Sequence, residues 1–190
     1  MRTFDLKGTK REQIGSKYAK QLRKEGQVPC IVYGNNTQIN FSVDQKELKG
    51  AVVTPHVYIV NLNIDNQVIP TVIKDLQFHP VTEEVLHADF YAFAPDQAIS
   101  VKLPLNLVGL APGVKVGGKL KQSARKVTVK GKAADLPEKI NVDISSLELE
   151  QSIKVGDLKF DNIQITDPQD ALICRILATR ATAAAATDKK

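Results

Sequence analysis

The chain of 190 residues contains no tryptophan, one methionine and two cysteines, and aromatic side chains make up only 5% of it. Cys30 and Cys174 lie far apart in separate apolar runs, which favours reduced, buried thiols over a disulfide between them. No apolar run approaches the roughly 18 residues of a membrane span, and the first residues lack the apolar core of a signal peptide. These absences predict a cytoplasmic protein.

Signatures of catalysis and metal binding are missing as well. The sequence has no His-x-x-x-His, Cys-x-x-Cys, phosphate-loop or Gly-x-Ser-x-Gly pattern. The glycine-rich string 109–118 lacks the spacing and the terminal Lys-Ser/Thr of a phosphate cradle. His79 and His87 have no further cluster of ligands, whereas metal sites normally recruit three or more. Pairing with other polar groups is a stronger interpretation than metal binding, and recognition of a nucleic-acid base is stronger than either. We therefore predict that the chain is not an enzyme and takes no cofactor or metal.

Positive charge is concentrated in two segments. The formal net charge is only +5, with a pI of about 9.1. Residues 1–24, however, hold eight Lys and Arg against two acids, and residues 115–132 hold seven bases and no acid. Charge gathered in this way produces a local positive potential, which favours a polyanionic partner such as RNA.

The composition changes near residue 95. Nine of the ten aromatic residues and all three histidines precede residue 94, and a short polar joint containing a proline follows at 94–97. We therefore predict a first domain at 1–94, a second at 95–178 and a disordered, alanine-rich tail at 179–190.

Apolar periodicity predicts a mainly β fold with short helices: a small β-barrel followed by a second, mostly β domain. Two helices are expected in the first half, one at 16–24 with Ser16 as its N-cap and Gly26 after its end, and one at 44–52. The expected strands are 2–7, 29–33, 57–64, 68–78 and 84–93 in the first half, and 99–108, 125–129, 140–144, 163–166 and 171–177 in the second.

The first predicted helix has a basic face. Its cations, at spacings of three and four, are Lys17, Lys20, Arg23 and Lys24. Tyr18 and Leu22 form a neighbouring apolar stripe that could pack on the barrel. A merely solvated face is the plain alternative, but residues 16–24 contain no acid to balance the charges. A phosphate backbone would relieve this repulsion and release counterions.

A strand near residue 88 offers groups for reading bases. Alternation places His87, Asp89 and Tyr91 on one face and apolar residues on the other. A carboxylate near a polyanion costs Coulomb energy unless it accepts a hydrogen bond from a base. This pattern indicates recognition of base edges in the wide minor groove or in unpaired segments of RNA.

Three ordered motifs, at 26–34, 74–80 and 87–90, closely resemble the bacterial large-subunit ribosomal protein family numbered twenty-five, which binds 5S ribosomal RNA. The second half, through 109–114 and 117–120, is similar to the long two-domain form known as general stress protein CTC. The resemblance implies an N-terminal barrel on the distorted loop E region of 5S RNA, and a C-terminal domain on the central protuberance of the large subunit, near 23S RNA or other ribosomal proteins.

The resemblance also implies site residues by position. They are Arg11 after the first strand, the basic pair Arg23 and Lys24, the strand-end tyrosine Tyr33, and the polar groups Gln77, His87 and Asp89. Lys24 departs from the arginine of some members, and lysine lacks bidentate geometry. Cys30 stands where a small residue is usual. The expected function is therefore a ribosomal 5S RNA binder; the alternative is a stress-related module for binding proteins, with incidental RNA binding.

Overall fold

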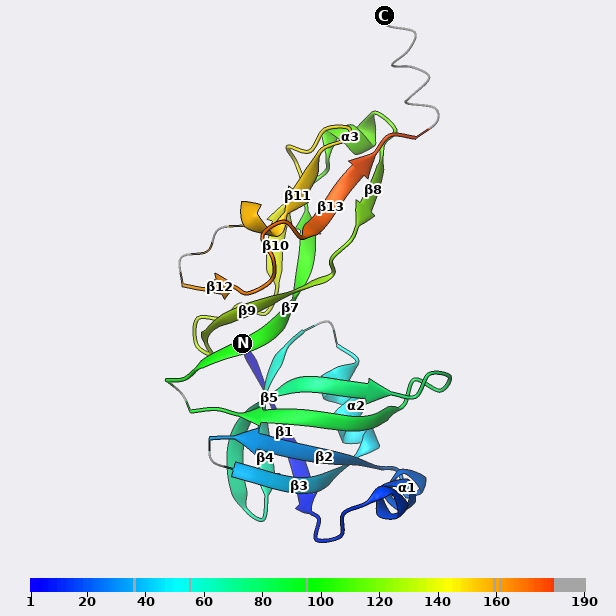
Figure 1. The fold of residues 1–190 in the computed structure, drawn as a ribbon, viewed down its shortest axis with the longest axis vertical. Helices are drawn as coiled ribbons and strands as arrows, with labels where there is room; N and C mark the ends of the chain where they lie inside the picture. Colours follow the sequence, from blue (N-terminus) through cyan, green and yellow to red (C-terminus); the bar gives the residue numbers. More distant parts are fainter. Residues whose placement is uncertain (36, 55, 95, 159, 161, 180–190) are drawn as a thin grey trace, which may run out of the picture. The chain divides into compact units, whose positions relative to one another are not determined.

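A computed structural model describes residues 1–35, 37–54, 56–94, 96–158, 160 and 162–179 (Figure 1). The chain divides into two compact units. The first comprises Met1–Val101 with Lys132–Ala134, and the second comprises the other described residues. All but the first residue of the predicted tail lies outside the described part of the chain.

Six strands of the first unit form a closed barrel in the order β1-β3-β2-β6-β5-β4 (Figure 1). Two of the neighbouring pairs, β1 with β4 and β2 with β6, are parallel, and the others are antiparallel. Closure leaves no free sheet edge. The strands are β1 (Arg2–Lys10), β2 (Gln27–Gly34), β3 (Thr37–Asp44), β4 (Tyr58–Ile64), β5 (Gln67–Phe78) and β6 (Val85–Ala92).

The barrel interior is apolar and tightly packed. Phe41 and Phe90 are fully buried, with ring centroids 5.5 Å apart. Gly8 lies against this pair: a Cβ built there would be 2.7 Å from the ring of Phe41, so only glycine fits. Cys30 is 1% exposed, and burial raises the pKa of its thiol to about 12. Both Cys30 and Cys174 are free and buried, as predicted from the sequence.

Two helices accompany the barrel, α1 (Ser16–Lys24) and α2 (Gln45–Val52). The prediction of Ser16 as N-cap is wrong: Gly15, at φ 130°, occupies the cap position, and no side chain caps α1. Its glycine backbone makes the reversal that a side chain would hinder. In α2, the carboxylate of Asp44 caps the helix by accepting a hydrogen bond from the Lys46 N–H at 2.7 Å.

The remaining strands form two small sheets, and most of their residues belong to the second unit. One has the order β10-β7-β9-β12 and the other the order β11-β13-β8. The strands are β7 (Ala98–Val108), β8 (Lys119–Gln122), β9 (Lys126–Lys132), β10 (Ile140–Asp143), β11 (Ser152–Lys154), β12 (Gln164–Ile165) and β13 (Leu172–Leu177). A short helix α3 (Pro112–Lys115) and a 3₁₀ turn η1 (Val155–Asp157) lie between them in sequence. The predicted fold class, a barrel followed by a second mostly β domain, is confirmed.

Three strands were not predicted. These are β3, β8 and β11. β3 is polar at alternate positions and contains Gln38, Asn40 and Ser42, and β8 and β11 have four and three residues. β3 alternates polar and apolar residues and could have been predicted, whereas strands as short as β8 and β11 give little apolar periodicity, so tertiary pairing decides them.

Candidate nucleic-acid interface

Polar side chains gather on the outer face of β2, β6 and β5, which are neighbours in the barrel. In the parallel pair, Tyr33 of β2 is opposite Tyr91 of β6, and in the antiparallel pair Gln77 of β5 is opposite His87. Of the residues that alternate with them, Val32, Ala88 and Phe90 are buried, and Leu76 is half-buried. The barrel thus brings three distant segments of sequence to one surface, which we call the strand face: Tyr33, Asp75, Gln77, His87, Asp89 and Tyr91.

Direct contacts order the strand face. Nδ1 of His87 lies 2.8 Å from a carboxylate oxygen of Asp89. The rings of Tyr33 and Tyr91 meet edge to face, with centroids 5.8 Å apart and an interplanar angle of 70°. The hydroxyl of Tyr91 accepts a hydrogen bond from the Gln97 side chain at 3.1 Å. Two rings and one acid–imidazole pair are therefore held in fixed positions at the barrel surface.

Asp75, which was not among the predicted site residues, also lies on this face. It lies directly opposite Asp89 across β5 and β6, next to an irregularity in the strand register. Partial burial raises the pKa of Tyr33, and the nearby carboxylates of Asp89 and Asp75 raise it further. Carboxylates facing each other across a strand pair repel. Hydrogen-bond donors from a ligand would relieve this repulsion, and exposed amino groups of bases are such donors.

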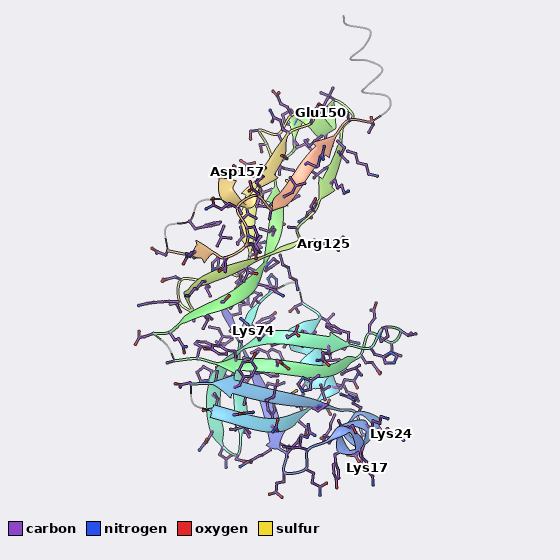
Figure 2. All side chains as sticks on the ribbon, viewed as in Figure 1. Lys17, Lys24, Lys74, Arg125, Glu150 and Asp157 are labelled. Carbon is purple, nitrogen blue, oxygen red and sulfur yellow. The ribbon has the colours of Figure 1, made fainter. Side chains whose placement is uncertain are left out.

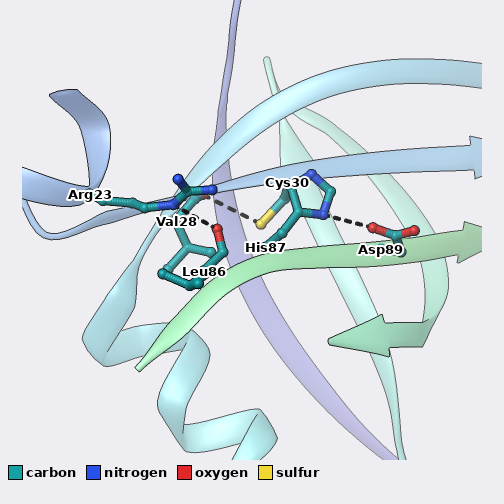
Figure 3. A network of polar contacts seen from close by, with 6 residues as sticks. All are labelled: Arg23, Val28, Cys30, Leu86, His87 and Asp89. Carbon is teal, nitrogen blue, oxygen red and sulfur yellow. Dashed lines mark hydrogen bonds and ion pairs between the residues drawn. The ribbon is translucent and has the colours of Figure 1, made fainter. Parts of the chain in front are cut away.

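Helix α1 lies beside this surface and is attached to it by Arg23. Nε of Arg23 donates a hydrogen bond to the carbonyl oxygen of Leu86 at 3.0 Å, directly before His87 in β6 (Figure 3). Arg23 is half-buried, whereas Lys17, Lys20 and Lys24 are exposed. Figure 2 labels Lys17 and Lys24 on this helix. Arg23 therefore positions the helix, while the three lysines face solvent.

The apolar contact of α1 differs from the predicted one. Leu22 is half-buried together with Ala19, but Tyr18 is 39% exposed. The expected pairing of Tyr18 with Leu22 as the packing stripe is therefore wrong. Ala19, Leu22 and Arg23 lie three and four residues apart and form the inner face instead. This leaves the Tyr18 ring available at the surface.

Arg11 connects the end of β1 to this region. Its backbone N–H donates to the carbonyl oxygen of Asn40 at 2.9 Å, and its guanidinium donates to the carbonyl oxygen of Gln13 at 3.3 Å. A hollow of about 400 Å³ separates this loop from α1. It is lined by Lys10, Arg11, Glu12, Gln13, Tyr18, Gln21, Leu22 and Glu25. Arg11 thus faces the same helix that carries the exposed lysines.

The structure therefore places the nine predicted site residues in two adjoining groups. The helical group contains Lys17, Lys20, Arg23 and Lys24, with Arg11 across the hollow. The strand group contains Tyr33, Gln77, His87 and Asp89. The bond between Arg23 and Leu86 joins the two groups (Figure 3).

His79 forms hydrogen bonds in the turn that follows β5. Its Nδ1 accepts hydrogen bonds from the backbone N–H groups of Val81 and Thr82, at 3.3 and 3.2 Å. These bonds shape the turn between β5 and β6.

Among the described residues no group of three or more His, Cys, Asp or Glu side chains could hold a metal ion. None of the described helices is long and apolar enough to cross a membrane.

Comparison with known proteins identifies the family. Residues 6–90 match the model of the ribosomal L25p family, and residues 98–180 match that of the C-terminal domain of ribosomal protein TL5. Proteins named large ribosomal subunit protein bL25 resemble the chain over almost its whole length. The relative from Phocaeicola vulgatus is 40% identical, over 98% of both chains. The relative from Azobacteroides pseudotrichonymphae is 41% identical, over 95% of this chain and 96% of its own length. The relative from Porphyromonas gingivalis is 36% identical, over the full length of both chains.

These matches confirm the family expected from the three sequence motifs, and also the prediction that the chain is not an enzyme. Two models in the same order account for both structural units. The chain belongs to the ribosomal L25p family, in the form that carries a TL5-type C-terminal domain.

Proposed function

We propose that this chain is a structural component of the large ribosomal subunit and that its barrel binds 5S ribosomal RNA. The names of its relatives support a place in the large ribosomal subunit. As a ribosomal protein, the chain would be located in the cytoplasm. The observation that supports RNA binding most directly is the junction of the basic face of α1 with the strand face through Arg23 and Leu86.

The two groups would have different tasks. Lys17, Lys20 and Lys24 are exposed on a helix without acids, so they suit the phosphate backbone. Asp89 and Asp75 would repel phosphate, and they suit the amino and imino groups of bases. His87 lies within 2.8 Å of Asp89 and would orient its carboxylate. The cations would provide most of the affinity, and the carboxylates would select the RNA.

A distorted RNA helix suits this division of tasks. In a regular A-form helix the major groove is too deep and narrow for side chains, and specific reading falls on the minor groove or on unpaired segments. The edge-to-face rings of Tyr33 and Tyr91 offer an apolar surface beside the donors and acceptors. These features support the loop E region of 5S RNA, which the family resemblance implies.

We assign 5S binding to residues 1–94, because all six barrel strands end by Ala92. The second unit would contact 23S RNA or neighbouring ribosomal proteins. The alternative, a stress-related module that binds proteins, would place the main function in that second unit.

A fragment of residues 1–94, shown to be folded by circular dichroism, should bind 5S RNA in a gel shift as the full chain does. A folded fragment that does not bind would favour the alternative.

Asp89→Ala in the full chain tests whether bases are read. We expect it to weaken binding to 5S RNA by about tenfold, as loss of one good base contact would. Binding to an unrelated RNA duplex should be unchanged or stronger, because a negative charge near phosphate has been removed. Lys20→Gln is the matched control, since it should weaken both complexes alike. Equal weakening of both complexes by Asp89→Ala would show that Asp89 does not select the RNA.

A further inference from the structure

The three-stranded sheet β11-β13-β8 of the second unit bears charge of only one sign. Its strands contain Lys119, Lys121, Lys154 and Arg175 and no Asp or Glu. All four cations are exposed. Two of them lie outside the basic segment 115–132, and only the pairing of the strands brings them to it.

The register places like charges side by side. In the antiparallel pair of β8 and β13, Lys121 lies directly opposite Arg175, and Lys119 follows two residues along. Side chains in such positions have Cβ atoms about 5 Å apart, and like charges there destabilise a sheet. On its other side, Arg175 is opposite Ser152 of β11. The opposite surface of the sheet is apolar, with Cys174 and Ile176 fully buried.

Little within the described chain compensates these charges. Lys154 lies 3.7 Å from Asp170, but both side chains are largely in water, at 51% and 99% exposure, so the pair is weak. In the described part of the chain, no carboxylate forms an ion pair with Lys119, Lys121 or Arg175. An external anion would remove the repulsion between Lys121 and Arg175.

We propose that this cationic face, made of Lys119, Lys121, Arg175 and Ser152, binds the phosphate backbone of an RNA duplex. Lys119 and Lys121 are about 7 Å apart along β8, so each can meet a different phosphate, and Arg175 can hold a phosphate in bidentate geometry. This second RNA site is independent of the barrel site.

The chemistry of the face favours RNA over a protein partner. Stable protein interfaces have an apolar or aromatic anchor at the centre. None of the large exposed hydrophobic side chains among the described residues belongs to β8, β11 or β13. A row of cations and one hydroxyl, with no such anchor, suits backbone contact that does not depend on sequence.

The test uses the full chain with Lys17, Lys20 and Lys24 changed to Gln, so that α1 contributes little to binding. In this background, Lys119→Gln, Lys121→Gln and Arg175→Gln should weaken binding to an unrelated RNA duplex of about 20 base pairs by at least about tenfold at low salt. The slope of log affinity against log salt should fall by about two to three, since each phosphate contact contributes about 0.7–0.9. In the matched control, Lys102, Lys126 and Lys139, three exposed lysines of the same unit, are changed to Gln instead. This control should lose less duplex binding than the variant of the cationic face.

Three results would overturn the proposal. One is unchanged duplex binding by the face variant, and another is an equal loss in the control variant. The third is binding of poly-L-glutamate that depends on the face while duplex binding does not, which would indicate an acidic protein partner. A separate gel shift of the unaltered chain with 5S RNA tests the barrel site. The two experiments therefore distinguish failure of the barrel site from failure of the cationic face.

The same face can be located in the assembled subunit. Cys30 and Cys174 are 1% and 0% exposed, so an iron chelate should attach selectively to a Ser152→Cys variant. In large subunits that contain the labelled chain, verified by co-sedimentation, we expect hydroxyl radicals to cleave ribosomal RNA beside position 152. Incorporated chains that give no RNA cleavage would contradict the proposal.

Discussion

The guanidinium of Arg23 and the carbonyl oxygen of Leu86 are joined by a 3.0 Å hydrogen bond across 63 residues of sequence. The bond attaches the last turn of α1 to the beginning of β6. A cation in the last turn of a basic helix thus has a structural role that its spacing alone does not reveal. Removing it should affect the helix position as well as the charge.

Arg23 and Lys24 make a matched pair for separating these effects. Arg23→Gln should lower the free energy of unfolding by about 1–2 kcal/mol, because a partly buried hydrogen bond from a charged donor is lost. Lys24→Gln should change it by less than about 0.5 kcal/mol, since the side chain is exposed. Urea unfolding measures both. Similar stabilities of the two variants would show that the bond to Leu86 is not needed to hold α1.

The three exposed lysines of α1 should determine the salt dependence of 5S RNA binding. Lys17→Gln, Lys20→Gln and Lys24→Gln together should reduce the slope of log affinity against log salt by about two to three. Gel shifts or fluorescence anisotropy between low and moderate salt measure the slope. Lys46→Gln with Lys49→Gln, on the exposed side of α2, serves as the control and should leave it unchanged. A slope that is unaffected by the α1 changes would remove α1 from the interface.

Stability should fall in alkaline solution because of Cys30. Burial raises the pKa of its thiol from 9.0 to about 12, so the folded chain retains the proton while the unfolded chain loses it above pH 9. Unfolding is then favoured by about 1.4 kcal/mol per pH unit between pH 9 and 12. Urea unfolding at pH 8 and pH 10 should show a smaller loss for Cys30→Ala than for the unaltered chain. Parallel losses in the two proteins would assign the effect to other groups.

Two glycines should respond to alanine in opposite directions. Gly8→Ala places a methyl group 2.7 Å from the Phe41 ring in the core, and overpacking of this kind costs about 1–3 kcal/mol. Gly50→Ala, in α2, places its methyl at an ordinary 3.4 Å from Phe4, and should stabilise the chain by about 0.5–1 kcal/mol. Thermal unfolding compares the two. A stable Gly8→Ala variant would show that the barrel can expand there.

The strand face was partly predictable because alternation along one strand depends only on sequence. His87 and Asp89 differ by two positions, so their common face follows from strand geometry. Asp75 lies two positions before Gln77, and the pairing of β5 with β6 is regular from Asp75 to Gln77, so the same alternation would have placed Asp75 on this face. The irregularity between Ile73 and Asp75 changes the register only of the earlier part of β5, and no local sequence pattern indicates it.

The barrel was predictable as a class but not as a topology. Apolar alternation is clear in β4 and β6, and β3 shows it as well, with Ile39, Phe41 and Val43 between polar residues, but β3 was overlooked. The two parallel pairings join segments more than 50 residues apart, and sequence patterns do not specify partners at that separation. Packing within the closed barrel selects them.

The parallel pairing of β2 with β6 also has a bearing on the order of events in a cell. Tyr33 meets Tyr91 only after the ribosome has synthesised the chain through β6, and pairings this distant form slowly. A nascent or prematurely released chain therefore has the lysines of α1 but not the complete surface that we propose for selecting RNA. Only chains with a closed barrel would then be incorporated into a ribosomal particle. RNA bound to the closed barrel would stabilise the folded state by mass action.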